Sequence, residues 1–328
     1  MGMKGFKGFE KDFSCGGKQC EENTTYEEYG EGCCYKGVMH FYEDPWEVLN
    51  HYDLVDGNGN LSEFAEVEAL GQVWNDGEKR ATNKIHVGAK LGLKGFLKAC
   101  IDFTLEKTNG TNLSGNSAQI GSSGDSAQIG SSGYSAQIGS SGDSAQIGSS
   151  GNYAQIGSSG YYAQIGSSGY SAQIGSSGDS AKIGSSGYYA QIGSSGYSAQ
   201  IGSSGYSAQI GSSGDYAKIG SSGYYAQIGS SGYSAQIGSS GDSAQIGSSG
   251  DYAQINSTGE DAVIMCAGRK SKAKGKKGSW ITLAEWVKDE EKGRYVPICV
   301  KTERVDGEKI KDDTYYTLKN GEFSEVEE

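Results

Sequence analysis

A nine-residue unit, S-A-Q-I-G-S-S-G-x, recurs with few departures from about Asn112 to Ile264 and constrains the fold of roughly half of the chain. A short, fixed period that combines glycine, serine, one small and one large apolar residue is typical of a stacked β-solenoid. We number the positions of a unit from one to nine in the register Gly121, Ser122, Ser123, Gly124, Asp125, Ser126, Ala127, Gln128, Ile129.

Apolar and polar residues alternate within each unit, as expected for a strand with one buried face. We therefore predict that the alanine at position seven and the isoleucine at position nine point inward, and that positions six and eight point outward. The G-S-S-G that follows is predicted to form a corner, because its glycines can adopt positive φ and its serines can hydrogen-bond to turn backbone. One unit is too short to close a coil, so we expect two units, or 18 residues, per coil and two facing sheets.

The variable positions five and six suggest binding residues along the edges of the rod. We number the units from the one that begins at Asn112, so the unit that begins at Gly121 is the second. At position five, even-numbered units carry aspartate or tyrosine, whereas odd-numbered units carry mostly tyrosine. Exposed tyrosine offers a large, rigid contact at low entropic cost. We therefore predict a partner-binding face made of Tyr153, Tyr189, Tyr225, Tyr170, Tyr188, Tyr206, Tyr224, Asp179 and Asp215. Recent duplication is the competing explanation of the pattern, because residues 169–204 and 205–240 differ only at Ser180 and Tyr216.

Composition divides the chain into three parts: residues 1–110, 111–268 and 269–328. The first part is predicted to be an α+β domain that caps the first coil. Its expected elements are a helix that runs from an N-cap at Asp44 to Tyr52, a strand over 63–73 and a helix over 91–101.

The third part begins with a basic run over 269–277, which we interpret as a solvated coil or an internal electrostatic contact rather than a nucleic-acid site. Three antiparallel strands are predicted to follow, over 280–287, 295–305 and 314–323. The predicted fold is therefore mainly β: a two-sided parallel β-solenoid flanked by an α+β N-terminal domain and a small antiparallel β cap.

Charge and cysteine content place the protein in a broad class. The formal net charge is −12, no apolar run reaches the length of a membrane span, and the first residues lack the hydrophobic stretch of a signal peptide. Seven cysteines, an odd number, fit a reducing compartment better than a disulfide framework. We therefore expect a cytoplasmic protein with no membrane partner.

Chemistry-bearing motifs are weak. The calcium-binding nonapeptide resembles this repeat in length, but it requires an aspartate where position six carries serine or tyrosine in all units except that of Asp261. Glu66 and Glu68 form an E-x-E pair of the kind found in ADP-ribosyltransferases, without the companion arginine and S-T-S motif. We predict no catalytic residue, no cofactor and no metal site. The spacing of one further group matches no standard zinc pattern: Cys15, Cys20, Cys33, Cys34 and His40.

Several segments together resemble an uncharacterised family of bacteriophage and prophage proteins. They are the opening K-G-F, the runs Y-K-G-V-M-H-F-Y-E-D-P-W-E-V-L-N-H-Y, F-A-E-V-E-A-L-G and T-N-K-I, and the C-terminal L-A-E-W and Y-T-L-K-N-G-E-F. The resemblance implies a phage origin and a repeat array of variable length, and it assigns no catalytic residue.

The leading functional hypothesis is a non-enzymatic scaffold that binds a protein partner, for example a host defence protein. Mimicry of DNA is an alternative, although duplex DNA of the same length, roughly 40 Å, carries about 24 phosphates. By contrast, 8 acidic and 2 basic residues over 112–264 leave a net six negative charges (8 − 2). A self-assembling fibre and an ADP-ribosyltransferase-like activity are further alternatives. Homo-oligomerisation through the tyrosines or the C-terminal strands stays open, and nucleic acid is not an expected partner.

Overall fold

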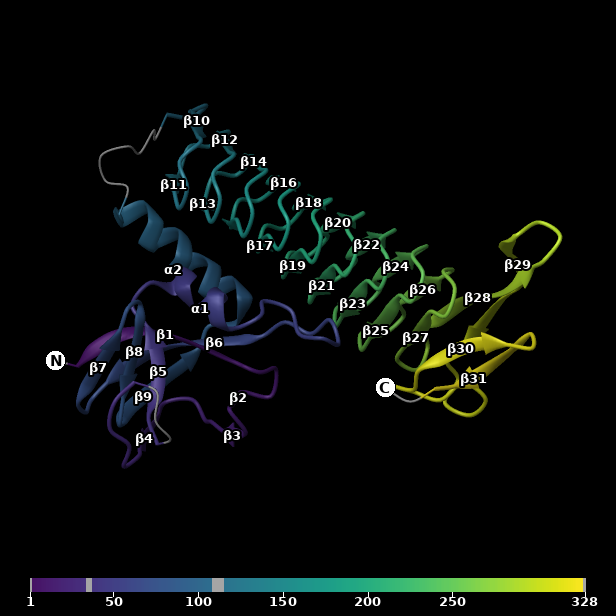
Figure 1. The fold of residues 1–328 in the computed structure, drawn as a ribbon, viewed down its shortest axis with the longest axis horizontal. Helices are drawn as coiled ribbons and strands as arrows, with labels where there is room; N and C mark the ends of the chain where they lie inside the picture. Colours follow the sequence, from purple (N-terminus) through teal and green to yellow (C-terminus); the bar gives the residue numbers. More distant parts are fainter. Residues whose placement is uncertain (1, 34–36, 108–114, 327–328) are drawn as a thin grey trace.

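The computed structural model describes residues 2–33, 37–107 and 115–326, which fold into an N-terminal domain, a central solenoid and C-terminal hairpins (Figure 1). The N-terminal domain is built on a seven-stranded antiparallel sheet. Its strands, in sheet order, are β4 (Thr24–Glu27), β9 (Lys84–Lys90), β6 (Glu63–Ala69), β1 (Met3–Phe9), β5 (Met39–Tyr42), β8 (Lys79–Thr82) and β7 (Val73–Asp76). Its other elements are the short strands β2 (Ser14–Cys15) and β3 (Lys18–Gln19) and the helices α1 (Pro45–His51) and α2 (Gly92–Lys107).

Helix α1 begins where the sequence predicts it. The Asp44 carboxylate accepts a hydrogen bond from the Trp46 backbone N–H at 2.8 Å, and Pro45 occupies the first turn, where it sacrifices no helical hydrogen bond. The predicted strand over 63–73 ends at Ala69, because the chain turns there before β7. Helix α2 continues to Lys107, six residues past the predicted end at 101 (107 − 101).

The solenoid contains two parallel sheets whose strands come from alternate repeat units. We call the first the open sheet; its strands are β10 (Gln119–Ser122), β12 (Gln137–Ser140), β14 (Gln155–Ser158), β16 (Gln173–Ser176), β18 (Gln191–Ser194), β20 (Gln209–Ser212), β22 (Gln227–Ser230), β24 (Gln245–Ser248), β26 (Val263–Cys266) and β28 (Trp280–Asp289). We call the second the docked sheet; its strands are β11 (Gln128–Ser131), β13 (Gln146–Ser149), β15 (Gln164–Ser167), β17 (Lys182–Ser185), β19 (Gln200–Ser203), β21 (Lys218–Ser221), β23 (Gln236–Ser239), β25 (Gln254–Ser257) and β27 (Lys272–Lys274).

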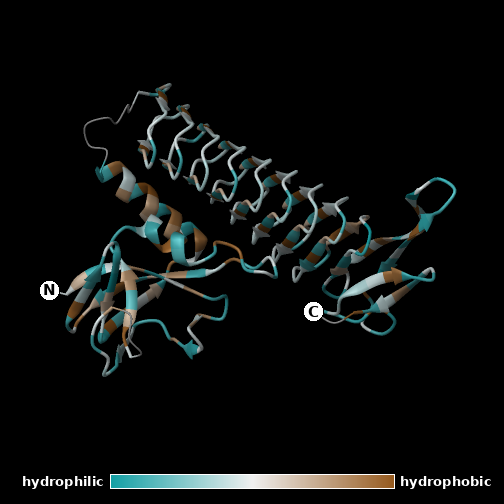
Figure 2. Cartoon of the chain, in the orientation of Figure 1, coloured by the Kyte–Doolittle hydropathy of each residue, from teal (hydrophilic) through white to brown (hydrophobic). Residues whose placement is uncertain are grey.

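Each strand pairs in register with the strand one coil later in its own sheet. Ile156 lies opposite Ile174 in the open sheet, and Ile165 lies opposite Ile183 in the docked sheet. Both pairs are separated by 18 residues (174 − 156 and 183 − 165), so two units form one coil as predicted. The hydropathy colouring accordingly repeats from one coil to the next (Figure 2).

The interior of the solenoid follows the predicted alternation. Alanines at position seven and isoleucines at position nine are buried from Ala136 to Ile264 and form one continuous core. The strand itself comprises positions eight, nine, one and two, however, so it begins two residues later than the predicted strand over positions six to nine. Within the strands the serine at position two therefore also points inward, and the glycine at position one points outward.

The prediction that repeat glycines adopt positive φ is wrong. Among the described units it is position six that takes the left-handed conformation, in every even-numbered unit, for example Ser180 at φ 55°, and in the odd-numbered units of Tyr225, Ser243 and Asp261. The glycine at position four is required for a different reason. A Cβ atom on Gly178 would lie 1.9 Å from the carbonyl oxygen of Gly160 in the preceding coil, which no side chain permits. Consecutive coils can thus stack at strand spacing only with glycine at this position.

The C-terminal part continues the two sheets rather than forming a separate domain. The basic run contributes β27 to the last coil, so the solenoid extends beyond the predicted boundary at residue 268. Hairpins then end both sheets with antiparallel strands: β29 (Arg294–Arg304) pairs with β28, and β30 (Tyr316–Lys319) pairs with β27 and with β31 (Glu322–Glu325). The third predicted strand, over 314–323, is two strands because Asn320 and Gly321 form a turn at positive φ.

The N-terminal domain lies along the side of the solenoid, so its predicted role as a cap on the first coil is wrong (Figure 1). Helix α2 packs across β11, β13, β15 and β17 of the docked sheet. Strands β10 and β11 stand first in their sheets, and no strand in the described part of the chain pairs with their outer edges. Apolar side chains of the domain fit the flat glycine-bearing face better than a polar strand edge.

Over most of the rod the inward serines of the two sheets differ in their hydrogen bonding, and this generates a prediction about stability. The exceptions are Ser239 and Ser257 of the docked sheet, whose hydroxyls, like the buried ones of the open sheet, have no partner among the described residues. The Ser185 hydroxyl in the docked sheet accepts a hydrogen bond from the Gly187 N–H at 3.3 Å, whereas the buried Ser176 hydroxyl in the open sheet has no partner among the described residues. We expect Ser185→Ala to destabilise the protein by about 1 kcal/mol, because it leaves a buried N–H unpaired. Ser176→Ala should be neutral or stabilising, as read from denaturation midpoints. Equal losses in both variants would contradict this assignment.

Candidate binding surface

The predicted tyrosines gather on one edge of the solenoid. We call this the tyrosine edge; it consists of the turns that lead from the docked sheet to the open sheet and carries Tyr134, Tyr153, Tyr170, Tyr188, Tyr189, Tyr206, Tyr224 and Tyr225. Because coils stack in register, the side chains at one position form a column along the rod. All the tyrosines of the predicted face therefore lie together, and their side chains are between 38% and 52% exposed.

The rings of the tyrosine edge contact one another in an almost unbroken row. Ring centroids lie 5.5 Å apart between Tyr170 and Tyr188, 4.7 Å between Tyr188 and Tyr206, and 5.8 Å between Tyr206 and Tyr224. These rings are stacked, with interplanar angles between 11° and 23°. Tyr189 packs edge-on against Tyr188, with ring centroids 4.6 Å apart. Such contacts hold each ring in place before any partner binds.

The phenol groups of this row remain neutral hydrogen-bond donors. Desolvation by the neighbouring side chains raises the pKa of Tyr188, and the adjacent phenols of Tyr189 and Tyr206 raise it further, because ionised neighbours would repel one another. The pKa of Tyr206 is raised in the same way. The row of rings therefore offers apolar area and hydroxyl donors without a charge, and the acidic residues of this edge, Asp242, Glu260 and Asp261, lie at its C-terminal end.

The two predicted aspartates lie on the opposite edge of the solenoid and do not form one site with the tyrosines. We call this the mixed edge; its turns lead from the open sheet to the docked sheet. The Asp179 carboxylate accepts a hydrogen bond from the Tyr197 backbone N–H one coil later at 2.8 Å, and Asp215 does the same for Tyr233 at 2.7 Å. The alternation of aspartate and tyrosine thus has a structural reason, since each aspartate caps a backbone donor of the next coil.

The docked sheet binds the N-terminal domain through its outward glycines. A Cβ atom on Gly184 would lie 2.6 Å from a methyl carbon of Leu97, and one on Gly238 would lie 2.2 Å from the Gly59 carbonyl oxygen. Apolar side chains from α1, α2 and the loop between α1 and β6 thus occupy a channel that any larger residue at position one would fill. The side chains that line this contact are Trp46, Leu54, Val55, Leu61, Leu97 and Ile101.

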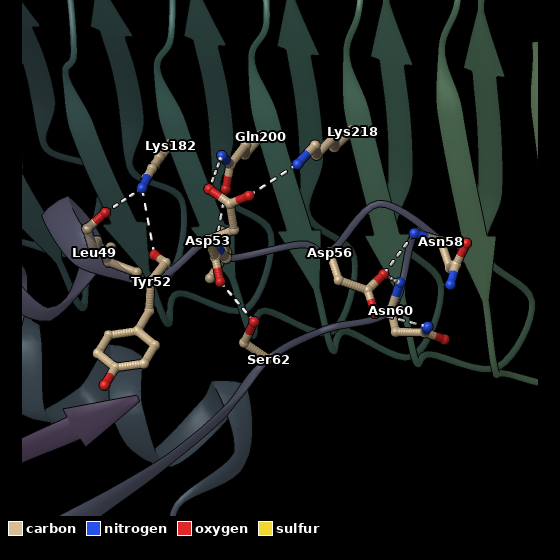
Figure 3. A network of polar contacts seen from close by, with 11 residues as sticks. Leu49, Tyr52, Asp53, Asp56, Asn58, Asn60, Ser62, Lys182, Gln200 and Lys218 are labelled. Carbon is tan, nitrogen blue, oxygen red and sulfur yellow. Dashed lines mark hydrogen bonds and ion pairs between the residues drawn. The ribbon is translucent and has the colours of Figure 1, made fainter. Parts of the chain in front are cut away.

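A polar network joins the loop after α1 to the docked sheet (Figure 3). The Asp53 carboxylate accepts a hydrogen bond from Gln200 Nε2 at 2.7 Å and pairs with Lys218 Nζ at 2.8 Å. Lys182 Nζ donates to the Leu49 carbonyl oxygen at the end of α1. Both lysines occupy position eight, where most other units have glutamine. The substitutions therefore fall where the sheet meets the N-terminal domain.

This network shifts the ionisation of its members. Burial pushes the pKa of Asp53 upward, but the hydrogen bonds from Lys218 and Gln200 and the charges of Lys218 and Lys182 outweigh it and hold the pKa below its usual value. Burial lowers the pKa of Lys182, with the Asp53 charge opposing the shift. At neutral pH the contact therefore contains one ion pair, between the Asp53 carboxylate and the Lys218 ammonium group, and the partly buried Lys182 lies close enough to feel the Asp53 charge.

The open sheet displays the same glycine and glutamine columns without a cover. A Cβ atom on Gly157, Gly175, Gly193, Gly211 or Gly229 would have no described atom within 4 Å, apart from its own chain neighbours. The columns line a shallow groove of about 1340 Å³ that follows the rod from β10 to β26. Sequence reasoning missed both this groove and the docking of the N-terminal domain. The sequence did contain a signal of the docking. Lysine replaces glutamine at position eight only in even-numbered units, and the strands that begin at these positions all belong to the docked sheet.

A second polar pocket lies between the N-terminal domain and the first coils, with a volume of about 660 Å³. Burial raises the pKa of Glu47 to about 7, and its hydrogen bond to Glu78 and the charge of Glu78 add to the shift. Burial also raises the pKa of Asp44 to about 6, although the hydrogen bond from Trp46 opposes the change. These carboxyl groups are thus poorly stabilised in their charged forms.

The remaining candidate chemistry is dispersed. Glu66 and Glu68 of the E-x-E pair lie on β6, where a Glu68 carboxylate oxygen accepts a hydrogen bond from the Gly2 N–H at 2.9 Å. Within the described ranges no three histidine, cysteine or acidic side chains gather as a metal site would require, and Cys34 lies outside those ranges. Neither α1 nor α2, the two helices described, is long and apolar enough to cross a membrane.

Docking through the glycines predicts that a glycine-to-alanine substitution at position one affects the two sheets differently. Gly238→Ala should destabilise the contact with the loop around Gly59, because the Cβ atom would meet backbone that cannot move aside. Gly229→Ala, the matched change on the open sheet, should leave stability unchanged within about 0.5 kcal/mol or raise it slightly. Hydrogen exchange of residues 53–61 measures the contact. Equal exchange in the two variants would exclude this docking mode.

The raised pKa of Glu47 in the second polar pocket predicts that mild acid stabilises the protein. The folded-state pKa of Glu47 lies above its ordinary value, so folding takes up protons, and the destabilising contribution is relieved as pH falls from about 7 toward 4.5. After allowance for solvent screening we expect about 1 kcal/mol from this group between pH 7.5 and 5.5. Glu47→Gln should remove that part of the pH dependence of the melting temperature. An identical pH profile in both proteins would contradict the assignment.

Comparison with known families and proteins bears on the N-terminal domain. Residues 3–99 match a family described as a domain of unknown function, DUF7666. The match covers the antiparallel sheet and α1 together with the first half of α2, and it leaves the solenoid outside. Comparison with curated proteins and with solved structures gives no match. The N-terminal part of the chain is thus similar to an uncharacterised domain family.

Proposed function

We propose that this protein is a non-enzymatic scaffold of bacteriophage or prophage origin that binds a protein partner through the tyrosine edge. The observation that carries the proposal is the row of exposed, mutually stacked tyrosines held at strand spacing by the solenoid. Tyrosine is, with tryptophan and arginine, one of the residues enriched at the hot spots of protein interfaces. A host defence protein is the class of partner that suits a phage-encoded binder.

The energetics of the edge favour binding without rearrangement. Ring stacking and the paired backbone already fix the side chains that a partner would contact, so little conformational entropy is lost on association. Because the phenols are neutral, binding should depend on buried ring area and hydrogen bonds more than on charge. Complexes of this kind retain their affinity as salt concentration rises.

The test is a triple variant that removes rings while keeping the fold. Tyr153, Tyr189 and Tyr225 occupy position six, where serine stands in intervening units, so their replacement by serine should preserve the coil. We expect the tagged wild-type chain to retain a specific protein from bacterial lysate at both low and high salt. The triple variant should bind that protein at least about tenfold more weakly, a loss typical of hot-spot residues.

A matched control uses the same repeat position on the other edge. Tyr162, Tyr216 and Tyr252 also occupy position six, with serine in intervening units, and their replacement by serine should leave the affinity unchanged. Melting curves establish that both variants are folded. Unchanged binding by the first variant, or an equal loss in both, would show that the tyrosine edge is not the site.

A further inference from the structure

The outer face of the open sheet carries no charged side chain from β10 to β26, in a chain of net charge −12. Its surface consists of a column of glutamines at position eight and a column of glycines at position one. At β26 these columns change character: Val263 replaces the glutamine and Met265 replaces the glycine. Trp280 and Thr282 of β28 continue the two columns, because they pair with Val263 and Met265.

The end of this face is an exposed apolar patch. Val263 is 49% exposed, Met265 is 52% exposed and Trp280 is 48% exposed. On β29, Arg304 pairs with Trp280 and borders the patch, and Val300, which pairs with Ala284 of β28, is a further exposed apolar residue at 64%. A contiguous group of large apolar side chains at the surface is typical of an interaction site. The patch is continuous with the glutamine and glycine columns, so we treat them as one surface.

The docked sheet shows what the same repeat does when it is covered. Its glycine column receives Leu97 and other apolar side chains of the N-terminal domain. Near its C-terminal end Tyr315 lies over the sheet, where its hydroxyl accepts a hydrogen bond from Gln254 Nε2 at 2.8 Å. The corresponding positions of the open sheet meet no described atom. A chemically equivalent face thus has an occupant on one side of the rod and none in the described chain on the other.

We propose that the open sheet binds the open sheet of a second copy of this chain, around a two-fold axis parallel to the solenoid axis. Such a rotation reverses the strand direction across the interface and keeps the height along the rod. The glutamine column of each copy therefore lies over the glycine column of the other copy. Projecting side chains meet the groove that lacks them, as ridges meet grooves in other packed surfaces.

The apolar end selects this axis over one perpendicular to the rod. Rotation about an axis parallel to the solenoid leaves the height of each residue along the rod unchanged. Val263 of one copy therefore meets Met265 of the other, and Trp280 meets Thr282. A perpendicular axis through the middle of the face would place the apolar patch against the glutamines and glycines of the first coils. Burial of apolar side chains against each other is the larger gain, and central aromatic and methionine side chains are typical anchors of interfaces.

Charge and area are consistent with a second copy as the occupant. Two identical chains of net charge −12 repel each other over most of their surfaces, and this face is one where no like charges meet. Ten strands at about 4.8 Å spacing and a width of about 15 Å give roughly 700 Å² per copy, or about 1,400 Å² in total. That area lies within the range of specific dimers. The dimer would also bring the tyrosine edge of one copy beside the mixed edge of the other.

The test uses the purified full-length chain alone, so it is independent of the proposed partner. We expect sedimentation analysis to show a reversible dimer at tens of micromolar. Met265→Lys and, separately, Gly193→Arg should each weaken dimerisation at least about tenfold, because each places a charge in the interface. Both variants should keep the wild-type melting temperature at concentrations where the protein is monomeric, since neither position is packed within a monomer.

A matched control replaces an exposed apolar residue elsewhere. Leu70 on the N-terminal domain is 48% exposed, and Leu70→Lys should leave the dimer unchanged. A monomer at about 100 µM would overturn the proposal and leave the face to a different protein. A dimer that keeps the wild-type affinity in Gly193→Arg and in Met265→Lys would also overturn it, because another surface would then hold the copies together.

The axis is tested by distances between identical sites in the two copies. A p-azidophenylalanine that carries a spin label can replace Tyr134, Tyr188 or Tyr224, which occupy position five at three heights along the tyrosine edge. A parallel two-fold axis predicts the same intermolecular distance at all three sites. Distances that pass through a minimum near Tyr188, or that increase steadily along the rod, would exclude it.

Discussion

The in-register backbone ladder between coils is the interaction on which the rest of the molecule depends. Each strand bonds to the strand 18 residues later. From Gly133 onward, each position-four glycine lies so close to the preceding coil that a Cβ atom would overlap a carbonyl oxygen of that coil. Once this spacing is fixed, every position of the repeat becomes a column along the rod. The buried isoleucines, the stacked tyrosines, the outward glutamines and the outward glycines are all consequences of one stacking step, so a change to that step would displace every column together.

The two outer faces show how one repeat serves two purposes. On the docked sheet the outward glycines leave room for Leu97 and Trp46, and lysines at two position-eight sites reach Asp53 and the carbonyl end of α1. Near its C-terminal end the same sheet is covered through Gln254 and Tyr315. On the open sheet the glycines have no such role within the described chain. Small residues cost stability in a strand, because they bury no side chain and order a flexible backbone. Their presence along the whole open face is therefore better explained by a contact with another chain than by the needs of a single rod.

The sequence was sufficient for the solenoid because its information is local and repeated. Alanine and isoleucine two residues apart identify the inward face, and the length of the unit fixes two units per coil. The position of the strand within the unit was misjudged, since glycines suggested turns although position-four glycine is selected by a close approach and position six supplies the positive φ. The site could be predicted only in part. The tyrosines follow from position alone. The docking of the N-terminal domain, however, depends on contacts between residues more than a hundred positions apart, such as Leu54 and Gln200, and no sequence period predicts such contacts.

The column arrangement also explains which changes of length the rod tolerates. Residues 169–204 and 205–240 are near-identical blocks of 36 residues, which corresponds to two complete coils. An insertion of whole coils keeps every residue on its own sheet and edge, whereas an insertion of one nine-residue unit would exchange the two faces for all later coils. Lys182 and Lys218 are one such block apart, so both stay on the docked sheet, where Asp53 pairs with Lys218 and lies close enough to influence Lys182. A block duplication therefore lengthens the tyrosine edge and the open face without disturbing the contact that holds the N-terminal domain.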